Sequence, residues 1–263
     1  MAVKLTLKEK IKHDGAMKAF GYIYKDPETN IPKLLGALQK LDDSDVVTRQ
    51  SKTIENSFLQ QDGNWRKLIL SLWTDIDHHQ FRELFESAVV NGSLIGSPRQ
   101  KAMREKCDCN IPWAILMDPT SACNLRCTGC WAAEYGHKLN LTLDELDDII
   151  RQGEEFGCYV YLYSGGEPLV RKDDLITLCE RHPECAFLAF TNSTLIDEQF
   201  ADEMLRVGNL VPAISVEGFE KDTDFRRGKG TFEAVMKAME VLRRKKLLFG
   251  ISCCYTSKNA EFI

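Results

Sequence analysis

The sequence lacks the apolar run of about 20 residues that a membrane-spanning helix requires. It also lacks an excess of basic residues, because 34 Lys and Arg stand against 39 Asp and Glu, for a net charge of −5. Nucleic acids and anionic membranes attract basic surfaces, so we expect neither as a partner. The first residues have no apolar core and no cleavage site of the kind found in signal peptides, so we expect a cytoplasmic location.

Cysteine is plentiful, with ten residues. In the reducing cytoplasm these are expected to be free thiols or metal ligands rather than disulfides. Five of them lie in or beside apolar segments and are predicted to be small buried side chains: Cys158, Cys179, Cys185, Cys253 and Cys254. Cys107 and Cys109 do not fit that description, and their role stays open.

Three further cysteines, Cys123, Cys127 and Cys130, form the run Cys-Asn-Leu-Arg-Cys-Thr-Gly-Cys. Three thiolates can hold a four-iron cluster but leave one iron without a protein ligand. Electron-transfer clusters are closed by four cysteines, and structural zinc sites also have four ligands, whereas catalytic metal sites keep a position open. The spacing therefore predicts a reactive metal site.

The chain divides into a mainly helical region, residues 1–110, and a region of alternating strands and helices, residues 111–263. In the first region, one helix is expected to begin at Asn30 as N-cap, and another to stop at Asn91-Gly92. In the second region, the predicted strands are 113–118, 159–163, 186–190, 211–216 and 248–254. One predicted helix begins at Thr142, which forms a capping box with Glu145. Three others are predicted near residues 173–181, 197–207 and 231–246. Repeated strand–helix units indicate an α/β fold with parallel strands and right-handed crossovers.

Polar clusters follow four of the predicted strands in turn. The three cysteines follow the first strand, residues 164–168 the second, residues 191–194 the third, and Ser215, Glu217 and Gly218 the fourth. In parallel α/β folds the loops after the strands carry the active site. We therefore expect these residues to meet at one rim of the sheet.

The cysteine run after one strand and Gly165-Gly166-Glu167-Pro168 after the next resemble the radical SAM superfamily. The resemblance covers about residues 112–257. It implies a partial parallel (β/α) barrel, here preceded by the helical N-terminal region. The family's barrel has six strand–helix units and this sequence has five strand-like runs. The sixth is therefore expected from a longer form of the protein or from another chain, unless the fold ends early.

The resemblance also implies cofactors and partners. A [4Fe-4S] cluster on the three cysteines would bind S-adenosyl-L-methionine at its open iron. An electron from an external donor would then yield a 5′-deoxyadenosyl radical that abstracts hydrogen from a substrate, a small molecule or a peptide. A peptide is the first expectation, because residues 215–218, Arg227-Gly228 and 230–232 resemble the peptide-modifying branch of the family. The oligomeric state is not predicted.

Site residues follow from the same resemblance. Gly165 and Gly166 lack a Cβ atom, so the backbone can approach a bound ligand closely. Glu167 offers a carboxylate to the ammonium group of the cofactor, and Pro168 stiffens the turn. Gly129 stands where many members of the family carry an aromatic residue near the adenine, and Trp131 is the expected substitute.

There are three more cofactor-binding candidates, two of which have an alternative interpretation. Ser215 is expected to bind the ribose. Arg227 either pairs with the methionine carboxylate or is a surface arginine. Asn192 either contacts the cofactor or caps the helix after the third strand. Tyr161, Tyr163 and Phe190 either line the cavity of the barrel or pack against the helices.

Two alternatives concern function. The first is a non-catalytic zinc or iron–sulfur structural module, in which Cys107, Cys109 or His137 supplies the fourth ligand. The second treats the helical N-terminal region as a binding module for a peptide or partner protein, in place of simple packing against the barrel.

Overall fold

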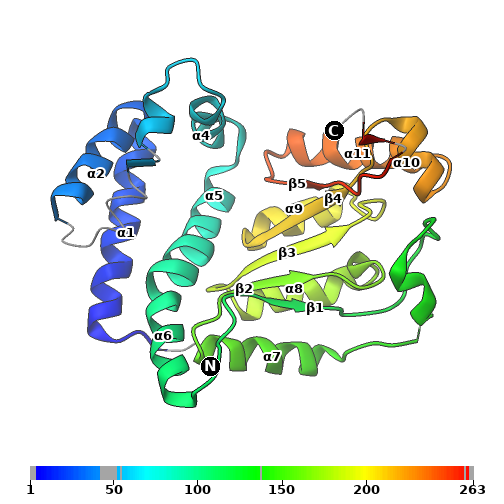
Figure 1. Cartoon of the computed structure of the whole chain (residues 1–263), viewed down its shortest axis with the longest axis horizontal. Coiled ribbons are helices and arrows are strands. Elements are labelled where there is room, and N and C mark those ends of the chain that lie inside the picture. Colours follow the sequence, from blue (N-terminus) through cyan, green and yellow to red (C-terminus); the bar gives the residue numbers. More distant parts are fainter. Residues whose placement is uncertain (1–3, 42–51, 54, 137, 258, 261–263) are drawn as a thin grey trace.

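The computed structural model describes residues 4–41, 52–53, 55–136, 138–257 and 259–260 (Figure 1). The N-terminal helices are α1 (Leu7–Lys25), α2 (Pro27–Leu41), α4 (Asn64–Asp75), α5 (His78–Leu84), the π-helix η1 (Phe85–Ile95) and α6 (Gly96–Cys107). The strands are β1 (Ile115–Met117), β2 (Val160–Tyr163), β3 (Ala186–Thr191), β4 (Leu210–Ser215) and β5 (Gly250–Ser252). The remaining helices are η2 (Trp131–Tyr135), α7 (Leu143–Glu155), η3 (Pro168–Arg171), α8 (Lys172–Arg181), α9 (Glu198–Val207), α10 (Glu220–Arg227) and α11 (Thr231–Arg244).

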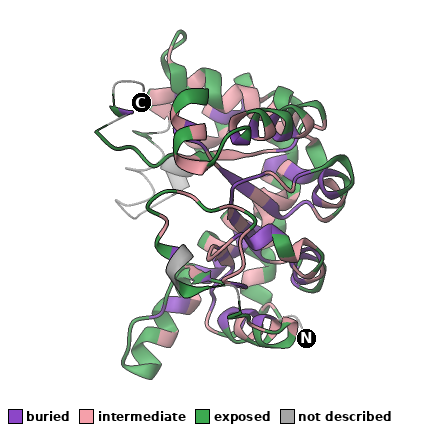
Figure 2. Ribbon diagram, turned by 90° about the vertical axis from the view of Figure 1, so that its right-hand side faces the viewer, coloured by how far each residue is buried: buried purple, intermediate pink, exposed green. Residues whose placement is uncertain are grey.

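The five strands form one parallel sheet in the order β1-β2-β3-β4-β5. Each strand except the edge strands thus lies between its neighbours in sequence, as expected for repeated strand–helix units. Viewed toward the carboxyl ends of the strands, the sheet is curved and open, with helices along its outer side (Figure 2). This arrangement confirms the predicted partial parallel barrel. The capping box at Thr142 and Glu145 that begins α7 is also confirmed.

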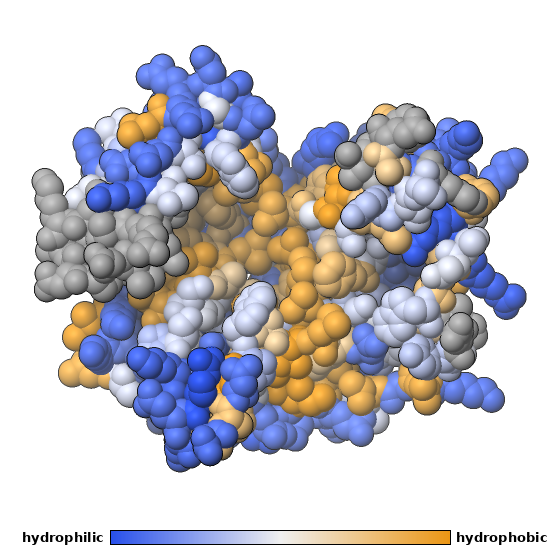
Figure 3. All heavy atoms as spheres, in the orientation of Figure 1, coloured by the Kyte–Doolittle hydropathy of each residue, from blue (hydrophilic) through white to orange (hydrophobic). Residues whose placement is uncertain are grey.

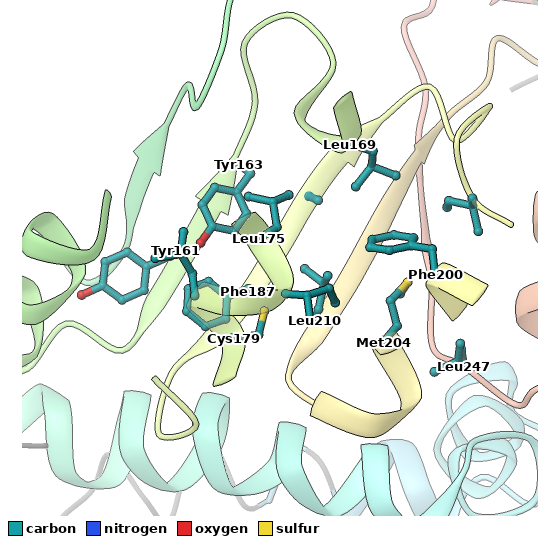
Figure 4. Packing of buried hydrophobic residues seen from close by; sticks show 14 of the residues in the cluster. Tyr161, Tyr163, Leu169, Leu175, Cys179, Phe187, Phe200, Met204, Leu210 and Leu247 are labelled. Carbon is teal, nitrogen blue, oxygen red and sulfur yellow. The ribbon is translucent and has the colours of Figure 1, made fainter. Parts of the chain in front are cut away.

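The outer face of the sheet carries the hydrophobic core. Tyr161 and Tyr163 of β2 are fully buried, and both stack on Phe187 of β3, with ring centroids 5.8 and 5.7 Å apart (Figure 4). Leu146 and Ile150 of α7 belong to the same cluster. Because side chains alternate between the faces of a strand, the two tyrosines point to the helices and not into the barrel.

The inner face changes in character along the strands. Its lower row, Leu116, Leu162, Leu188 and Val211, is apolar, and these residues are paired across β1 to β4. Near the carboxyl ends, Ser215 of β4 pairs with Ser252 of β5. Figure 3 shows a hollowed face over the middle of the sheet where hydrophobic side chains gather. On the inner face, apolar side chains in the middle of the strands therefore give way to polar side chains at their carboxyl ends.

The helices α5, η1 and α6 run across the amino-terminal ends of the strands (Figure 1). Three buried amide side chains along them, Gln80, Asn91 and Gln100, bond to the backbone that leads into the strands. Gln80 donates to the Leu210 carbonyl and accepts from the Leu248 N–H. Asn91 donates to the Glu184 carbonyl, and Gln100 donates to the Gly157 carbonyl. A buried amide that satisfies backbone groups is a specific contact, so this segment braces the end of the barrel opposite to the active-site rim.

Two predicted helix ends are wrong. The helix does not stop at Asn91-Gly92, because the Asn91 side chain reaches the carbonyl of Glu184 at 3.1 Å and the helical path continues as η1 into α6. Asn30 does not cap a helix either. It lies inside α2 and donates a hydrogen bond to the carbonyl of Tyr22. In both cases a tertiary contact uses the side chain that the local pattern assigned to a helix end.

In the part of the chain that the structure describes, no helix combines the length and the apolar character that crossing a bilayer demands. The division into two regions at residue 110 stays a prediction, although the last N-terminal helix ends at Cys107 and the first strand begins at Ile115.

Candidate active site

The cysteine run forms a loop after β1, at the carboxyl end of the sheet. All three thiols are partly exposed. Of the five cysteines predicted to be buried, Cys158, Cys179 and Cys185 are buried, whereas the prediction is wrong for Cys253 and Cys254, which are exposed. The backbone N–H of Leu125 donates to the Cys123 sulfur at 3.4 Å, and the N–H of Cys130 donates to the Cys127 carbonyl at 3.2 Å. Backbone hydrogen bonds to sulfur are among the features that tune iron–sulfur clusters. The backbone of the loop thus already bonds to one of its sulfur atoms, that of Cys123.

The Gly-Gly-Glu loop after β2 packs directly on the segment that leads into the cysteine loop. The N–H of Gly166 donates to the Thr120 carbonyl at 2.9 Å, and the N–H of Glu167 donates to the Ala122 carbonyl at 2.8 Å. A Cβ atom on Gly166 would lie 2.2 Å from the Ala122 oxygen, and one on Gly165 would lie 2.6 Å from the Thr120 oxygen. The two glycines therefore allow the Gly-Gly-Glu loop to lie close to the backbone of residues 120–122.

Glu167 joins the ends of β2 and β3. Its side chain is buried, and its carboxylate accepts hydrogen bonds from Thr191 Oγ1 at 2.6 Å, the Asn192 N–H at 2.7 Å and the Leu169 N–H at 2.9 Å. Burial raises the pKa of Glu167, while these hydrogen bonds oppose the rise. Pro168 begins η3, with Glu167 as its N-cap. Three of the acceptor positions of this carboxylate are taken by the protein itself.

Asn192 binds the cysteine loop. Its Nδ2 donates to Asn124 Oδ1 at 2.8 Å, and Asn124 Nδ2 in turn donates to Thr194 Oγ1 at 2.8 Å. Its Oδ1 accepts from both the N–H and the hydroxyl of Thr194. The interpretation of Asn192 as a helix cap is wrong, because Asp197 caps α9. Asn124 was not predicted as a site residue, although its position inside the cysteine motif was a signal for it.

The end of β4 contributes Ser215 and a group of charged side chains. Ser215 is partly buried at the rim. Arg227 is not a surface arginine, because its side chain is only 10% exposed. Its Nε and Nη2 both donate to the buried carboxylate of Glu217. Arg226 pairs with the same carboxylate. The helix α10 that carries both arginines was not predicted, and neither was the role of Glu217, which the sequence marks only as a polar residue after a strand.

The two ends of the cysteine loop meet opposite charges. Burial raises the pKa of the Cys127 thiol, and the charges of Arg227 and Arg226 oppose that rise. Burial also raises the pKa of the Cys123 thiol, and the Glu167 charge adds to it. The hydrogen bonds to Glu217 raise the pKa of Arg227 against the effect of burial, so this arginine stays charged.

The donor set fits a cluster better than a single ion. Within the described ranges, no three His, Cys, Asp or Glu side chains lie close enough together to hold one metal ion. A four-iron cluster takes each thiolate at a separate iron, so its three ligands lie further apart than the ligands of one zinc ion. Of the fourth ligands considered for zinc, Cys107 is exposed at the end of α6, on the far side of the barrel, and Cys109 is exposed. His137 lies outside the described residues.

A cavity of about 780 Å³ adjoins the Gly-Gly-Glu loop. Its walls include Gly165 and Gly166 together with Trp131 of η2 and Asp118 and Leu116 from the first strand and its end. Volumes of 300–1,000 Å³ are typical of small-molecule sites. Trp131 therefore lies beside the loop to which the resemblance assigns the cofactor.

The family model described as the Radical SAM superfamily matches residues 117–255, more than half of the chain. The chain belongs to this superfamily and is an enzyme. The family uses a [4Fe-4S] cluster and S-adenosylmethionine as cofactors.

Among named relatives, the chain is 29% identical over 153 residues to the Fe-coproporphyrin III synthase of Methanosarcina barkeri, covering 57% of this chain and 38% of that protein. It is 30% identical over 161 residues to the AdoMet-dependent heme synthase of the same organism, covering 59% and 46%. It is 28% identical over 173 residues to a cysteine-type anaerobic sulfatase-maturating enzyme of Clostridium perfringens, covering 58% and 46%. The chain thus spans less than half the length of these relatives.

Among solved structures, SuiB of Streptococcus suis, crystallised with its precursor peptide SuiA, superposes with a TM-score of 0.53 and 20% identity. The match covers 66% of this chain and 40% of SuiB. It supports the fold of the partial barrel.

The replacement Asn124→Ala is expected to loosen the cysteine loop, because it removes both hydrogen bonds to the end of β3 and leaves the Asn192 amide without its acceptor. We expect a loss of about 1–3 kcal/mol in the free energy of unfolding and faster hydrogen exchange over residues 123–130. Urea unfolding and exchange mass spectrometry measure the two effects. The matched control is Asn110→Ala, at an exposed position; equal exchange in both variants would refute the anchoring role.

Proposed function

We propose that this chain is a radical S-adenosylmethionine enzyme whose cluster is held by Cys123, Cys127 and Cys130. One observation supports this most strongly. The cysteine loop, the Gly-Gly-Glu loop and the ends of β3 and β4 are joined by hydrogen bonds into a single rim. A rim built in this way holds a cluster and a chelating ligand in fixed relative positions, which is what a cofactor-dependent reaction requires of the protein.

The bound cofactors supply the chemistry: an electron given to the cluster cleaves S-adenosylmethionine to methionine and a 5′-deoxyadenosyl radical, which takes a hydrogen atom from the substrate. The chain's own residues bind and orient. We assign the cofactor's methionine end to the loop of Gly165, Gly166, Glu167 and Pro168. Glu167 Oε2 accepts the Asn192 N–H at 2.7 Å. We assign the remaining lone pair of this oxygen to the ammonium group of the cofactor.

At the other side of the rim we assign the ribose to Ser215, supported by its place at the carboxyl end of β4 on the inner face. Asn192 acts on the cofactor indirectly, because its side chain bonds to Asn124 in the cysteine loop. Arg227 also acts indirectly, because its guanidinium bonds to Glu217. The apolar row Leu116, Leu162, Leu188 and Val211 lines the space to which we assign hydrogen abstraction.

The substrate class that we propose first is a peptide. The sulfatase-maturating relative is named for the maturation of another protein, which supports this class. The relatives named as Fe-coproporphyrin III and heme synthases favour a tetrapyrrole as the competing class. An external electron donor and a cytoplasmic location complete the proposal, since the reduced cluster needs a source of electrons and protection from oxygen.

The decisive experiment is anaerobic reconstitution with iron and sulfide, followed by addition of S-adenosylmethionine and dithionite. We expect about four irons per chain, the brown colour of a cluster, and release of 5′-deoxyadenosine. A colourless protein with one tightly bound zinc would overturn the proposal and favour the structural module. Transfer of deuterium from labelled peptides or from labelled coproporphyrin to 5′-deoxyadenosine then distinguishes the two substrate classes.

A further inference from the structure

A buried carboxylate holds two arginines beside the cysteine loop. Glu217 is 2% exposed and lies two residues beyond the end of β4. Its Oε2 accepts from Arg227 Nε at 2.6 Å, and its Oε1 accepts from Arg227 Nη2 at 2.7 Å and from Arg226 Nη1 at 2.6 Å. The contact to Arg227 is bidentate, the geometry that makes an ion pair strong and directional. One negative charge therefore fixes two positive ones.

The fold places Glu217 independently of the arginines. Its backbone N–H donates to Thr223 Oγ1 at 3.1 Å, and its carbonyl accepts from Asn259 Nδ2 at 3.0 Å. Thr223 is fully buried and Asn259 is 3% exposed. The carboxylate thus starts from a rigid backbone position, and the long arginine side chains are oriented by it.

The arginine pair also touches the cysteine loop. The Arg226 carbonyl accepts a hydrogen bond from the N–H of Thr128 at 2.7 Å, and Thr128 directly follows Cys127. Thr128, Glu217 and Arg226 also line one small cavity beside the loop. The sum of the three charged groups is one positive charge at the Cys127 end of the loop.

We propose that Glu217 is a positioning residue that holds Arg226 and Arg227 against the cysteine loop, and that the net positive charge of this trio makes the cluster easier to reduce. This rests on the proposed function. Reduction adds one electron to a cluster that already carries three thiolates, and a nearby positive charge stabilises the added electron. The hydrogen bond from Thr128 to the Arg226 carbonyl ties the backbone of the helix that carries both arginines to the cysteine loop.

The test is a reductive titration of the anaerobically reconstituted full chain, followed by electron paramagnetic resonance. In Arg227→Gln the trio is neutral, and we expect the ratio of reduced to oxidised cluster at a fixed potential to fall about tenfold. In Glu217→Gln the remaining amide oxygen can still accept from the arginines, so the trio carries two positive charges in place, and the ratio is expected to rise by a similar factor. The double variant Glu217→Gln/Arg227→Gln restores one positive charge, so its ratio is expected to return close to that of the parent.

The double variant separates electrostatics from structural damage, because damage predicts that it is the worst of the three. Arg226→Gln, at the more exposed arginine, repeats the neutral-trio test if an Arg227 variant does not fold. The control Glu233→Gln removes a carboxylate from an exposed pair with Lys237 on α11 and is expected to leave the ratio unchanged. Ratios that do not follow the charge of the trio overturn this inference. If the parent chain binds no cluster at all, the proposed function itself fails.

Discussion

Replacement of Cys127 by Ala is expected to abolish cluster assembly and all release of 5′-deoxyadenosine. Loss of one of three thiolates leaves two irons of the cluster without a protein ligand, so we expect less than about one tenth of the parent's iron after reconstitution and desalting. The backbone of the loop is held by Thr128 and by Asn124, not by the Cys127 sulfur, so the fold should be retained. Iron analysis and circular dichroism measure the two outcomes separately.

Cys107→Ala is the matched control for that variant. This cysteine is exposed at the end of α6, where the structure places it away from the rim. We expect full iron content and unchanged cofactor cleavage. If Cys107→Ala loses metal as Cys127→Ala does, Cys107 is a ligand, and the interpretation of a cluster with one open iron is wrong.

Gly166→Ala is expected to have the largest effect on stability among single methyl additions at the rim. The new Cβ atom would lie 2.2 Å from the oxygen of Ala122 and 2.6 Å from that of Ser121, both of which belong to the backbone that carries the cysteine loop. Overpacking against backbone costs about 1–3 kcal/mol or more, because no side chain can rotate away. Thermal unfolding should show a Tm lower by roughly 5 °C or more, together with reduced iron uptake.

Gly21→Ala in α1 provides the comparison. No atom lies within 4 Å of its added Cβ, and the residue is exposed within a helix. Alanine there should raise the free energy of unfolding by about 0.5–1 kcal/mol, because glycine is the poorer helix former. Equal Tm values for Gly166→Ala and Gly21→Ala would show that the two loops are not packed as closely as described.

Both large effects have the same cause: the cysteine loop contains no helix or strand, and neighbouring loops hold it in place. The cysteine loop receives hydrogen bonds or backbone packing from the loops that follow β2, β3 and β4. Such a loop folds correctly only when the sheet has formed in register. Metal uptake should therefore depend on residues that never touch the metal.

The strands and helices of the barrel were predictable because their signals are local. An apolar run of strand length, a capping box such as that of Thr142 and Glu145, and periodic helical patterns each depend on neighbours in sequence. The cysteine spacing and Gly165–Pro168 also lie within short segments. From these signals alone the sequence determined the α/β class and the family to which the chain belongs, and it predicted the rim to which we assign the site.

The partners of individual side chains depended on contacts between segments far apart in sequence. Asn91 resembled a helix stop but bonds to the backbone before β3, and Asn192 resembled a cap but holds Asn124, 68 residues earlier. Arg227 resembled a surface residue until Glu217 was seen beside it. Sequence periodicity reports which face of an element is buried, whereas a polar side chain is defined by the group that it meets. The register of the parallel sheet brings the loops after β1 to β4 to one rim. These side-chain contacts therefore depend on the tertiary structure.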